Sequence, residues 1–357
     1  MPSTSNPSKP ENAAQLYPPS FVDRLMALIE RLPGSTWVFY LLATVVIVAV
    51  SHGLRWSDGT IPTGTIDTYR LTNDFLTIYG LAILHLLNST ARRSLEDFRP
   101  ALGKLEAEYE KLRYGLTVLS PRIVYITTGI GFLLTALNIA DNPEGWGITD
   151  ETSLATDVFS VLQATLQLVS SIGFGVQAIR QVRLIAYIHR SATNINLYES
   201  DSHHAFSRLT ARAALALVAP IYFMSLISYL KEGGIEVTST STKFMIVFAM
   251  LVSAAVFILP LLGMRRRLVE EKNRLMVESD RRFEATARML HERVDGKSLE
   301  KMDDLNKTMA SLILEKDTLK KISTMPWEAE TMRGFLSSVG LPILLWFVTA
   351  YFGRFFQ

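Results

Sequence analysis

The class of this protein follows from one apolar segment, FMIVFAMLVSAAVFILPLLGM, at residues 244–264. The segment has 21 residues and no charged side chain. About 20 mostly apolar residues in a helix are enough to cross the roughly 30 Å hydrocarbon core of a bilayer. The segment therefore predicts a membrane-spanning helix, and other parts of the chain repeat its pattern.

The whole chain is unusually apolar, because 48% of its 357 residues are hydrophobic. The predicted spans lie near residues 36–54, 72–90, 123–140, 157–179, 213–230 and 244–264, with one more in 326–357. We therefore predict an all-α fold, a polytopic membrane helical bundle of about seven spans, with its membrane domain in residues 21–264. Residues 1–20 are rich in Ser, Pro and Asn, and we expect a disordered tail there.

The last predicted span has two readings. Residues 334–352 are apolar, but Pro342 interrupts them. A helix that crosses the bilayer and a helix that lies in the membrane interface both remain open.

The basic residues predict the orientation. Of the 36 Lys and Arg residues, 31 lie in the N-terminal tail and in the second, fourth and sixth loops between the predicted spans. The other 5 lie in the remaining loops and the C-terminal tail. Lys and Arg are enriched in short cytoplasmic loops, so we expect a multi-pass protein of the cell membrane with a cytoplasmic N-terminus. The chain has no cysteine, which excludes a disulfide-stapled external domain.

The second loop carries a regular row of large apolar residues, spaced by alternating steps of 3 and 4. They are Leu95, Phe98, Leu102, Leu105, Tyr109, Leu112, Leu116 and Leu119. This heptad spacing is typical of a helix that packs along a second helix. We predict one cytoplasmic helix over 95–119, with these residues as its packing seam.

The sixth loop predicts a helical hairpin over residues 265–325. Between Gly263 and Gly296 it contains neither Pro nor Gly, so the span before it can continue as a helix into the cytoplasm. Asp295-Gly296 is a turn signal, and a second amphipathic helix follows. We expect this hairpin to form a coiled-coil bundle with the 95–119 helix. It could merely space the spans or join two copies, or it could transmit a signal.

Polar residues share one face of the predicted span 157–179, and two ionisable residues lie in span 72–90. The face comprises Asp157, Ser160, Gln163, Gln167, Ser170 and Gln177, and the ionisable pair is Asp74 and His85. Such groups must be paired or must face water inside a membrane. They could line a polar path, or they could form hydrogen bonds between packed helices. Asp74 and His85 could also lie at the two interfaces.

Other polar clusters give weaker signals. The third loop holds only acidic charges, Asp141 to Asp157, and we read it as a solvated loop rather than a cation site. His203 and His204 follow Glu199 and Asp201, but no second cluster completes a zinc site. The usual phosphate-loop, zinc-protease and serine-hydrolase motifs are missing, so we predict no enzyme activity and no cofactor. The basic residues alternate with acids, which does not favour nucleic-acid binding.

Two segments of the second half of the chain resemble a known group of proteins. They are ISTMPW at 322–327 with TMRG at 331–334 and LPILLW at 341–346, and the internal stretch from Ile188-His189-Arg190 through Asn196-Leu197 to AFSRLTA at 205–211. Both are similar to segments of uncharacterised bacterial multi-pass membrane proteins. The resemblance implies a membrane protein and carries no activity or functional residue with it.

These observations leave two function classes open. The first is a non-enzymatic scaffold or signalling component, which binds a protein partner or a second copy through its cytoplasmic helices. The second is a transporter or channel for a small solute or ion, which would use the polar face of the fourth span. The heptad row and the long hairpin favour the first class, and the second lacks any visible inverted repeat.

Overall fold

The computed structural model describes residues 17–232, 240–296 and 302–340, with side chains omitted at 200–201 and 225–245. Within these ranges every regular element is a helix, which confirms the predicted all-α class. The predicted C-terminal membrane helix lies partly outside the described residues, which end at Gly340.

The six predicted spans before residue 265 each lie inside one long helix. These helices are α2 (Thr36–Asp58), α3 (Thr68–Asp97), α5 (Pro121–Asp141), α6 (Leu154–Ser191), α8 (Ser207–Glu232) and α9 (Thr240–Asp295). The remaining helices are α1 (Phe21–Arg31), α4 (Tyr109–Thr117), α7 (Ser200–His204), α10 (Met302–Lys321) and α11 (Ala329–Phe335). Short turns of other helix types are η1 (Arg99–Ala101), η2 (Gly103–Glu108), η3 (Glu144–Trp146) and η4 (Leu336–Gly340).

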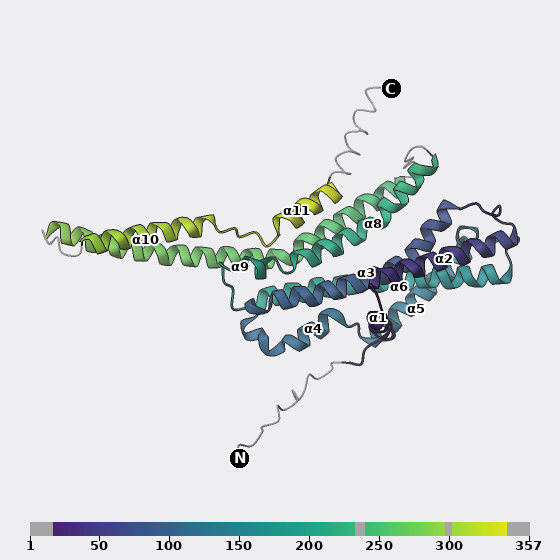
Figure 1. Ribbon diagram of the computed structural model, residues 1–357, viewed down its shortest axis with the longest axis horizontal. Coiled ribbons are helices and arrows are strands. Elements are labelled where there is room, and N and C mark those ends of the chain that lie inside the picture. The colour runs from purple at the N-terminus through teal and green to yellow at the C-terminus, as the bar shows by residue number, and fades with distance from the viewer. Residues whose placement is uncertain (1–16, 233–239, 297–301, 341–357) are drawn as a thin grey trace, which may run out of the picture.

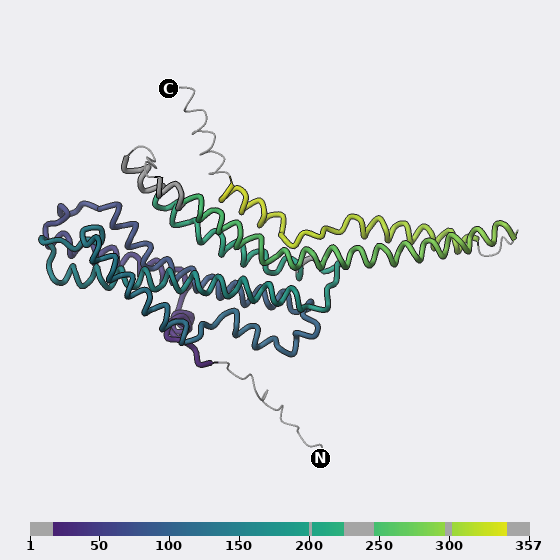
Figure 2. Tube along the Cα trace, turned by 180° about the vertical axis from the view of Figure 1, so that it is seen from behind, coloured from purple at the N-terminus to yellow at the C-terminus, as the bar shows by residue number. Residues whose placement is uncertain are grey.

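Helix α3 lies at the centre of the bundle, where it packs against α2, α4, α6 and α8 (Figure 1). Helix α5 covers α6, and α8 pairs with α9, which also touches α6. Helix α9 extends beyond this bundle, and α10 packs along the extended part, as both views show (Figures 1 and 2). The predicted hairpin over 265–325 is thus formed by α9 and α10, and it projects away from the rest of the helices.

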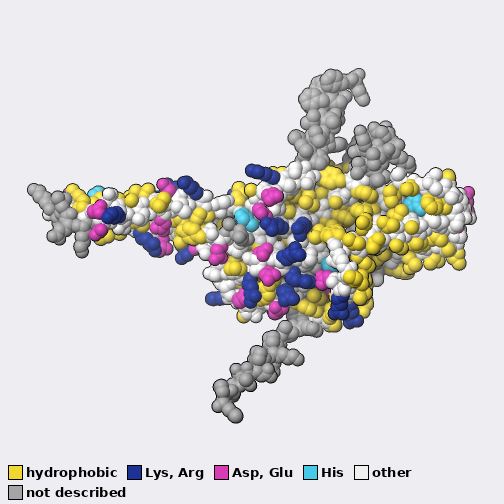
Figure 3. All heavy atoms as spheres, viewed as in Figure 1, with side chains coloured by type: hydrophobic (Ala, Val, Ile, Leu, Met, Phe, Trp, Pro, Cys, Tyr) yellow, Lys and Arg dark blue, Asp and Glu magenta, His cyan; other side chains and the backbone are white. Residues whose placement is uncertain are grey.

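The surface identifies a membrane protein. Figure 3 shows a broad apolar surface over the end of the molecule that holds α2, α5 and α6, whereas charged side chains gather over the middle and over the hairpin. Among the described residues, four helical stretches are long and apolar enough to cross a bilayer. They are Thr36–Asp58, Gly103–Asp141, Leu154–Ser191 and Ile246–Asp295. Their exposed side chains include Trp37, Leu41, Phe132 and Leu251, which water would solvate poorly.

The predicted span 72–90 is not among these four stretches, and the predicted span 213–230 includes residues whose side chains are not described. Helix α3 carries Asp74, His85 and Asn88, which lower its hydropathy, and all three are buried among other helices. A helix enclosed by protein needs no lipid-facing surface, so its composition differs from that of α2 or α9.

The predicted single helix over 95–119 is wrong. Helix α3 ends at Asp97, and the chain then turns through η1 and η2 before α4 begins at Tyr109. Pro100 has no backbone N–H with which to continue the hydrogen bonds of α3, and Gly103 has a φ of 56°, in the left-handed region. A Cβ at Gly103 would lie 2.3 Å from Thr193 Oγ1, so the turn is also closely packed. Helix α4 consequently folds back onto α3 and α6.

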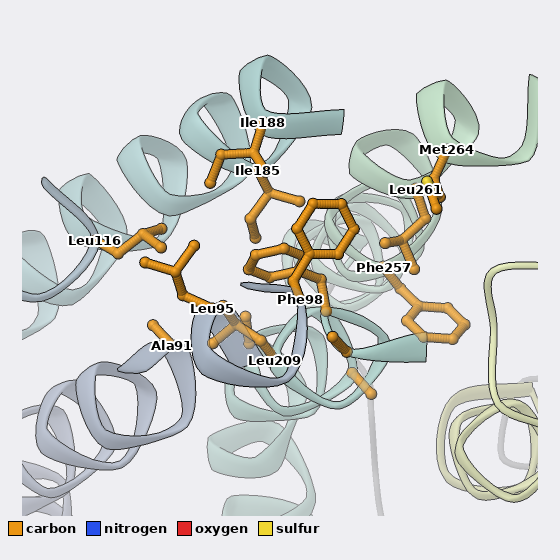
Figure 4. Packing of buried hydrophobic residues seen from close by; sticks show 14 of the residues in the cluster. Ala91, Leu95, Phe98, Leu116, Ile185, Ile188, Leu209, Phe257, Leu261 and Met264 are labelled. Atoms are coloured by element: carbon orange, nitrogen blue, oxygen red, sulfur yellow. The ribbon is translucent and has the colours of Figure 1, made fainter. Parts of the chain in front are cut away.

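The seam residues are nevertheless buried, apart from Tyr109, which is half-buried. Phe98 lies at the centre of the largest apolar cluster, between Ile185 and Ile188 of α6, Leu209 of α8, and Phe257 of α9 (Figure 4). The seam therefore packs inside the bundle, chiefly against α3 and α6, and not along a coiled coil with α10.

The predicted disordered tail is wrong for its last residues. Tyr17 donates a hydrogen bond to the carbonyl of Val118 at 2.9 Å, and its ring packs on Tyr114. Ser20 caps α1 through a reciprocal pair of hydrogen bonds with Asp23. Residues 1–16 lie outside the described part of the chain.

Candidate functional site: the polar interface of α3 and α6

The polar face of α6 lies against α3 and α2. The two helices α3 and α6 lie close together at Gly80, where a Cβ atom would lie 2.6 Å from Ser170 Oγ and 3.0 Å from the Ser170 backbone. Glycine permits this approach because it has no side chain, as is common between membrane helices. Polar side chains of the two helices therefore meet on both sides of this crossing.

The outer side of the crossing holds a buried cluster of ionisable groups. Gln163 donates to Asp74 Oδ1 at 2.6 Å, and His52 Nδ1 of α2 lies 3.6 Å from Asp74 Oδ2. Arg55, one turn further along α2, donates to Ser160 Oγ at 3.1 Å. Asp74 is only 1% exposed and Arg55 3%. Opposite charges buried close together offset part of the cost of removing each from water.

Several polar atoms of this outer cluster have no hydrogen-bond partner in the described structure. They are His52 Nε2, Arg55 Nη1, Asp74 Oδ2 and Gln167 Oε1. Buried polar groups are nearly always paired, because an unpaired one costs about 1–3 kcal/mol. The cluster thus has unused capacity to donate and to accept hydrogen bonds.

His52 and Arg55 did not emerge as site residues from the sequence. Arg55 follows the predicted span 36–54 and was counted with the outer loop, and His52 lies within that span. The available signal was their spacing, because Ser51, His52 and Arg55 share one face at the end of an otherwise apolar helix. All three are buried.

On the inner side of the crossing the amide N–H groups of Gln177 and Gln181 are paired, whereas their Oε1 atoms have no partner in the described structure. The side-chain amide of Gln177 donates to Asn88 Oδ1 and to the carbonyl of Leu116, both at 2.9 Å. Gln181, one turn later, donates to the same two acceptors at 3.2 and 3.0 Å. These bonds tie α3, α4 and α6 together. Interhelical bonds of this kind contribute about 0.6–2 kcal/mol each.

His85 belongs to a separate contact. Its Nε2 lies 3.2 Å from Glu30 Oε1 of α1, and its Nδ1 lies 3.0 Å from the Tyr40 hydroxyl of α2. Because a carboxylate only accepts, Nε2 carries the proton toward Glu30, and a neutral ring accepts from Tyr40 at Nδ1. His85 is thus buried inside the protein, where it joins α1, α2 and α3.

The predicted set of polar residues therefore divides into distinct places. Ser160, Gln163 and Asp74 meet in the outer cluster, and Gln177 lies in the inner one. Asp157 lies apart, at the start of α6, where it accepts a hydrogen bond from Thr152 at 2.6 Å. Ser170 donates to the Gln167 carbonyl of its own helix at the crossing itself.

No group of three or more possible metal ligands occurs among the residues that the structure describes. His203 is buried on its short helix, while the side chain of Asp201 is not described. In the acidic third loop, Arg70 donates to the backbone carbonyls of Glu144 and Gly145, so the loop closes over the outer cluster.

A further polar contact joins α8 to α11. Arg208 donates to both carboxylate oxygens of Glu328, at 2.9 and 3.0 Å. The backbone N–H of Glu328 in turn donates to Ser207 Oγ at 3.2 Å. The segments at 205–211 and 322–334, which carry the resemblance noted above, therefore lie in contact.

Comparison of the chain with protein-family models, with curated proteins and with solved structures found no match.

Proposed function

We propose that this membrane protein is a non-enzymatic scaffold or signalling component, with seven spans and a cytoplasmic N-terminus, which acts through its α9–α10 hairpin. The hairpin would bind a protein partner or a second copy of the chain. The last span would be completed by residues 334–352. No cofactor enters this proposal.

The length of α9 is the observation that carries the proposal. Its 56 residues correspond to roughly 80 Å of helix, whereas the hydrocarbon core is roughly 30 Å thick. The apolar half begins near Ile246, and the other half carries repeated ion pairs such as Arg282–Glu278 and Arg288–Glu284. A charged helical arm of this length, braced by α10, supports a role in binding outside the membrane.

The charge distribution supports a cytoplasmic location for the hairpin. The loop that contains it holds 16 of the 36 basic residues. The second and fourth loops, which the same orientation places on the cytoplasmic side, are also basic, and residues of both pack in the apolar cluster around Phe98. This agreement supports one compartment for all three loops.

The alternative is a small-solute or ion transporter or channel, and the outer cluster is the observation in its favour. Asp74, His52 and Arg55 are buried and have unpaired polar atoms, which is the character of a site for a polar solute or a proton. On the inner side of the same interface, the amide groups of Gln177 and Gln181 donate to α3 and α4, which favours packing instead.

Accessibility of the α6 face distinguishes the two proposals. The chain contains no cysteine, so single cysteines can be placed at Gln163, Gln167 and Ser170, with Val161 and Val169 as controls on other faces. Intact membranes are then treated with an impermeant thiol reagent, with an Asp150 cysteine as a positive control. We expect the α6 positions to stay unlabelled, as in a dry packed interface. Fast labelling confined to the polar face would contradict this and would favour transport.

A further inference from the structure

The short amphipathic helix α1 has four distinct faces: one packed on the bundle, one apolar and exposed, one basic and one acidic. Its buried face, Val22, Met26 and Ile29, packs on the bundle formed by α2, α3 and the start of α5. A second face is apolar yet exposed, and it consists of Phe21, Leu25 and Leu28, with Leu32 directly after the helix. At 3.6 residues per turn these four side chains fall within about 60° of the helix circumference.

The charged residues of α1 occupy the two remaining faces. Arg24 and Arg31 are exposed and lie on the side of the apolar face that points away from the bundle. Asp23 and Glu30 lie opposite the apolar face. Around the helix, the face packed on the bundle is therefore followed by the exposed apolar face, then the basic face and then the acidic face.

The orientation of α1 fits a helix that lies in the membrane plane. Figures 1 and 2 show α1 end-on, whereas α2, α3, α5 and α6 run across the picture, so α1 crosses the spanning helices steeply. Only four residues separate it from α2, whose second residue is the exposed Trp37. Tryptophan is typical of the boundary between headgroups and hydrocarbon. The exposed face of α1 is thus continuous with the lipid-facing surface of α2.

The attachment of α1 to the bundle fixes this orientation. Glu30 accepts from His85 and lies 3.7 Å from Arg92, and Asp23 accepts from the backbone N–H of Leu119 at 3.4 Å. Each acidic residue of α1 is therefore held by the protein. Arg24 and Arg31 have no ion-pair partner in the part of the chain that the structure describes.

We propose that α1 is an interfacial lipid-binding helix, which inserts Phe21, Leu25, Leu28 and Leu32 among the acyl chains of the inner leaflet and binds anionic phospholipid headgroups through Arg24 and Arg31. An apolar face flanked by basic residues is the surface that binds anionic membranes. The inference rests on the membrane embedding and the orientation of the chain, but not on the role of the hairpin.

The first test measures the depth of α1. Single cysteines at Leu28, Ala27 and Val45 of the full chain are labelled with an environment-sensitive fluorophore in nanodiscs of phosphatidylcholine and phosphatidylglycerol. We expect Leu28, like Val45 on α2, to be quenched by nitroxide-labelled acyl chains and shielded from aqueous iodide, and Ala27 to show the reverse. A Leu28 probe open to iodide while Val45 is quenched by lipid would overturn the proposal. If the Val45 probe were also open to iodide and not quenched by lipid, the result would instead overturn the membrane embedding.

The second test measures headgroup preference. At equal mole fractions, nitroxide-labelled phosphatidylglycerol should quench the Leu28 probe about twofold more than nitroxide-labelled phosphatidylcholine. The double variant Arg24→Gln with Arg31→Gln should abolish this difference. The matched control, Lys104→Gln with Lys111→Gln, removes the same charge from η2 and α4 and should leave it intact. Equal quenching by the two lipids in the unaltered chain would overturn the headgroup assignment.

Discussion

Gly80 and Ser170 determine how closely α3 and α6 can approach, and the polar contacts on both sides depend on that approach. A second glycine does the same between α5 and α6, because a Cβ at Gly131 would lie 2.6 Å from Val169 Cγ2. Gly129, two residues earlier, has no neighbour within 4 Å of such a Cβ. The GxG pair in the sequence thus contains one residue that needs to be glycine for packing and one that does not.

Gly80→Ala should destabilise the protein by about 1–3 kcal/mol, because the added methyl group meets the Ser170 backbone as well as its side chain. The matched control is Gly173→Ala on α6, where nothing lies within 4 Å, and there the better helix propensity of Ala should be neutral or slightly stabilising. Thermal unfolding in detergent measures both. Equal transition temperatures for the two variants would contradict the close crossing.

At the scale of single elements, the hairpin depends on the apolar contact between α9 and α10. Leu319 of α10 is 1% exposed, whereas Leu314 on another face of the same helix is 69% exposed. Leu319→Asp places a carboxylate in that contact and should separate α10 from α9, since a charge is costly to bury. Limited proteolysis should then cut the hairpin faster, and Leu314→Asp should be cut at the unaltered rate. If the Leu319→Asp variant were cut no faster than the unaltered protein, the proposed packing of α10 on α9 would be contradicted.

The contact between α8 and α11 should depend on pH. The hydrogen bonds from Arg208 hold the pKa of Glu328 below its usual range. A lowered carboxylate pKa means that the contact contributes fully above the unfolded pKa and is lost as pH falls through the folded value. Arg208 is largely exposed, so the contribution is at most about 1 kcal/mol. Hydrogen exchange of α11 amides should therefore quicken, after correction for intrinsic rates, as the pH falls below 4.5, the ordinary pKa of a Glu carboxyl, and Glu328→Gln should remove this pH dependence.

At the scale of the whole molecule, the length of the apolar segments predicted the helices well. Each of the six predicted segments from 36–54 to 244–264 lies inside a helix, although α6 and α9 run far beyond the apolar part. The absence of Pro and Gly between residues 263 and 296 predicts the extension of α9. A search for apolar segments alone misses the extension of α6, because polar helical residues outside a membrane have no comparable signature. The count of seven spans and the resemblance to bacterial membrane proteins stay predictions.

The sequence predicted less of the tertiary arrangement. The apolar row from Leu95 to Leu119 correctly predicted which residues are buried. It wrongly predicted one continuous helix, because the chain turns at Pro100 and Gly103. The α6 polar face was visible as a periodic pattern, yet its partners lie on α2 and α3, about 90 to 110 residues away in the chain. Periodicity shows which face is buried, and it contains no information about the helix that covers it.

The proposed role depends on a cytoplasmic location of the hairpin, and thiol labelling from outside the cell tests that location. Single cysteines are placed at Asp150, in the third loop, and at Leu314, exposed on α10. Intact cells receive an impermeant maleimide before or after permeabilisation. We expect the cysteine at position 150 to label in intact cells and the cysteine at position 314 to label only after permeabilisation. Labelling of Leu314 in intact cells would contradict the cytoplasmic hairpin and the scaffold or signalling role proposed for it.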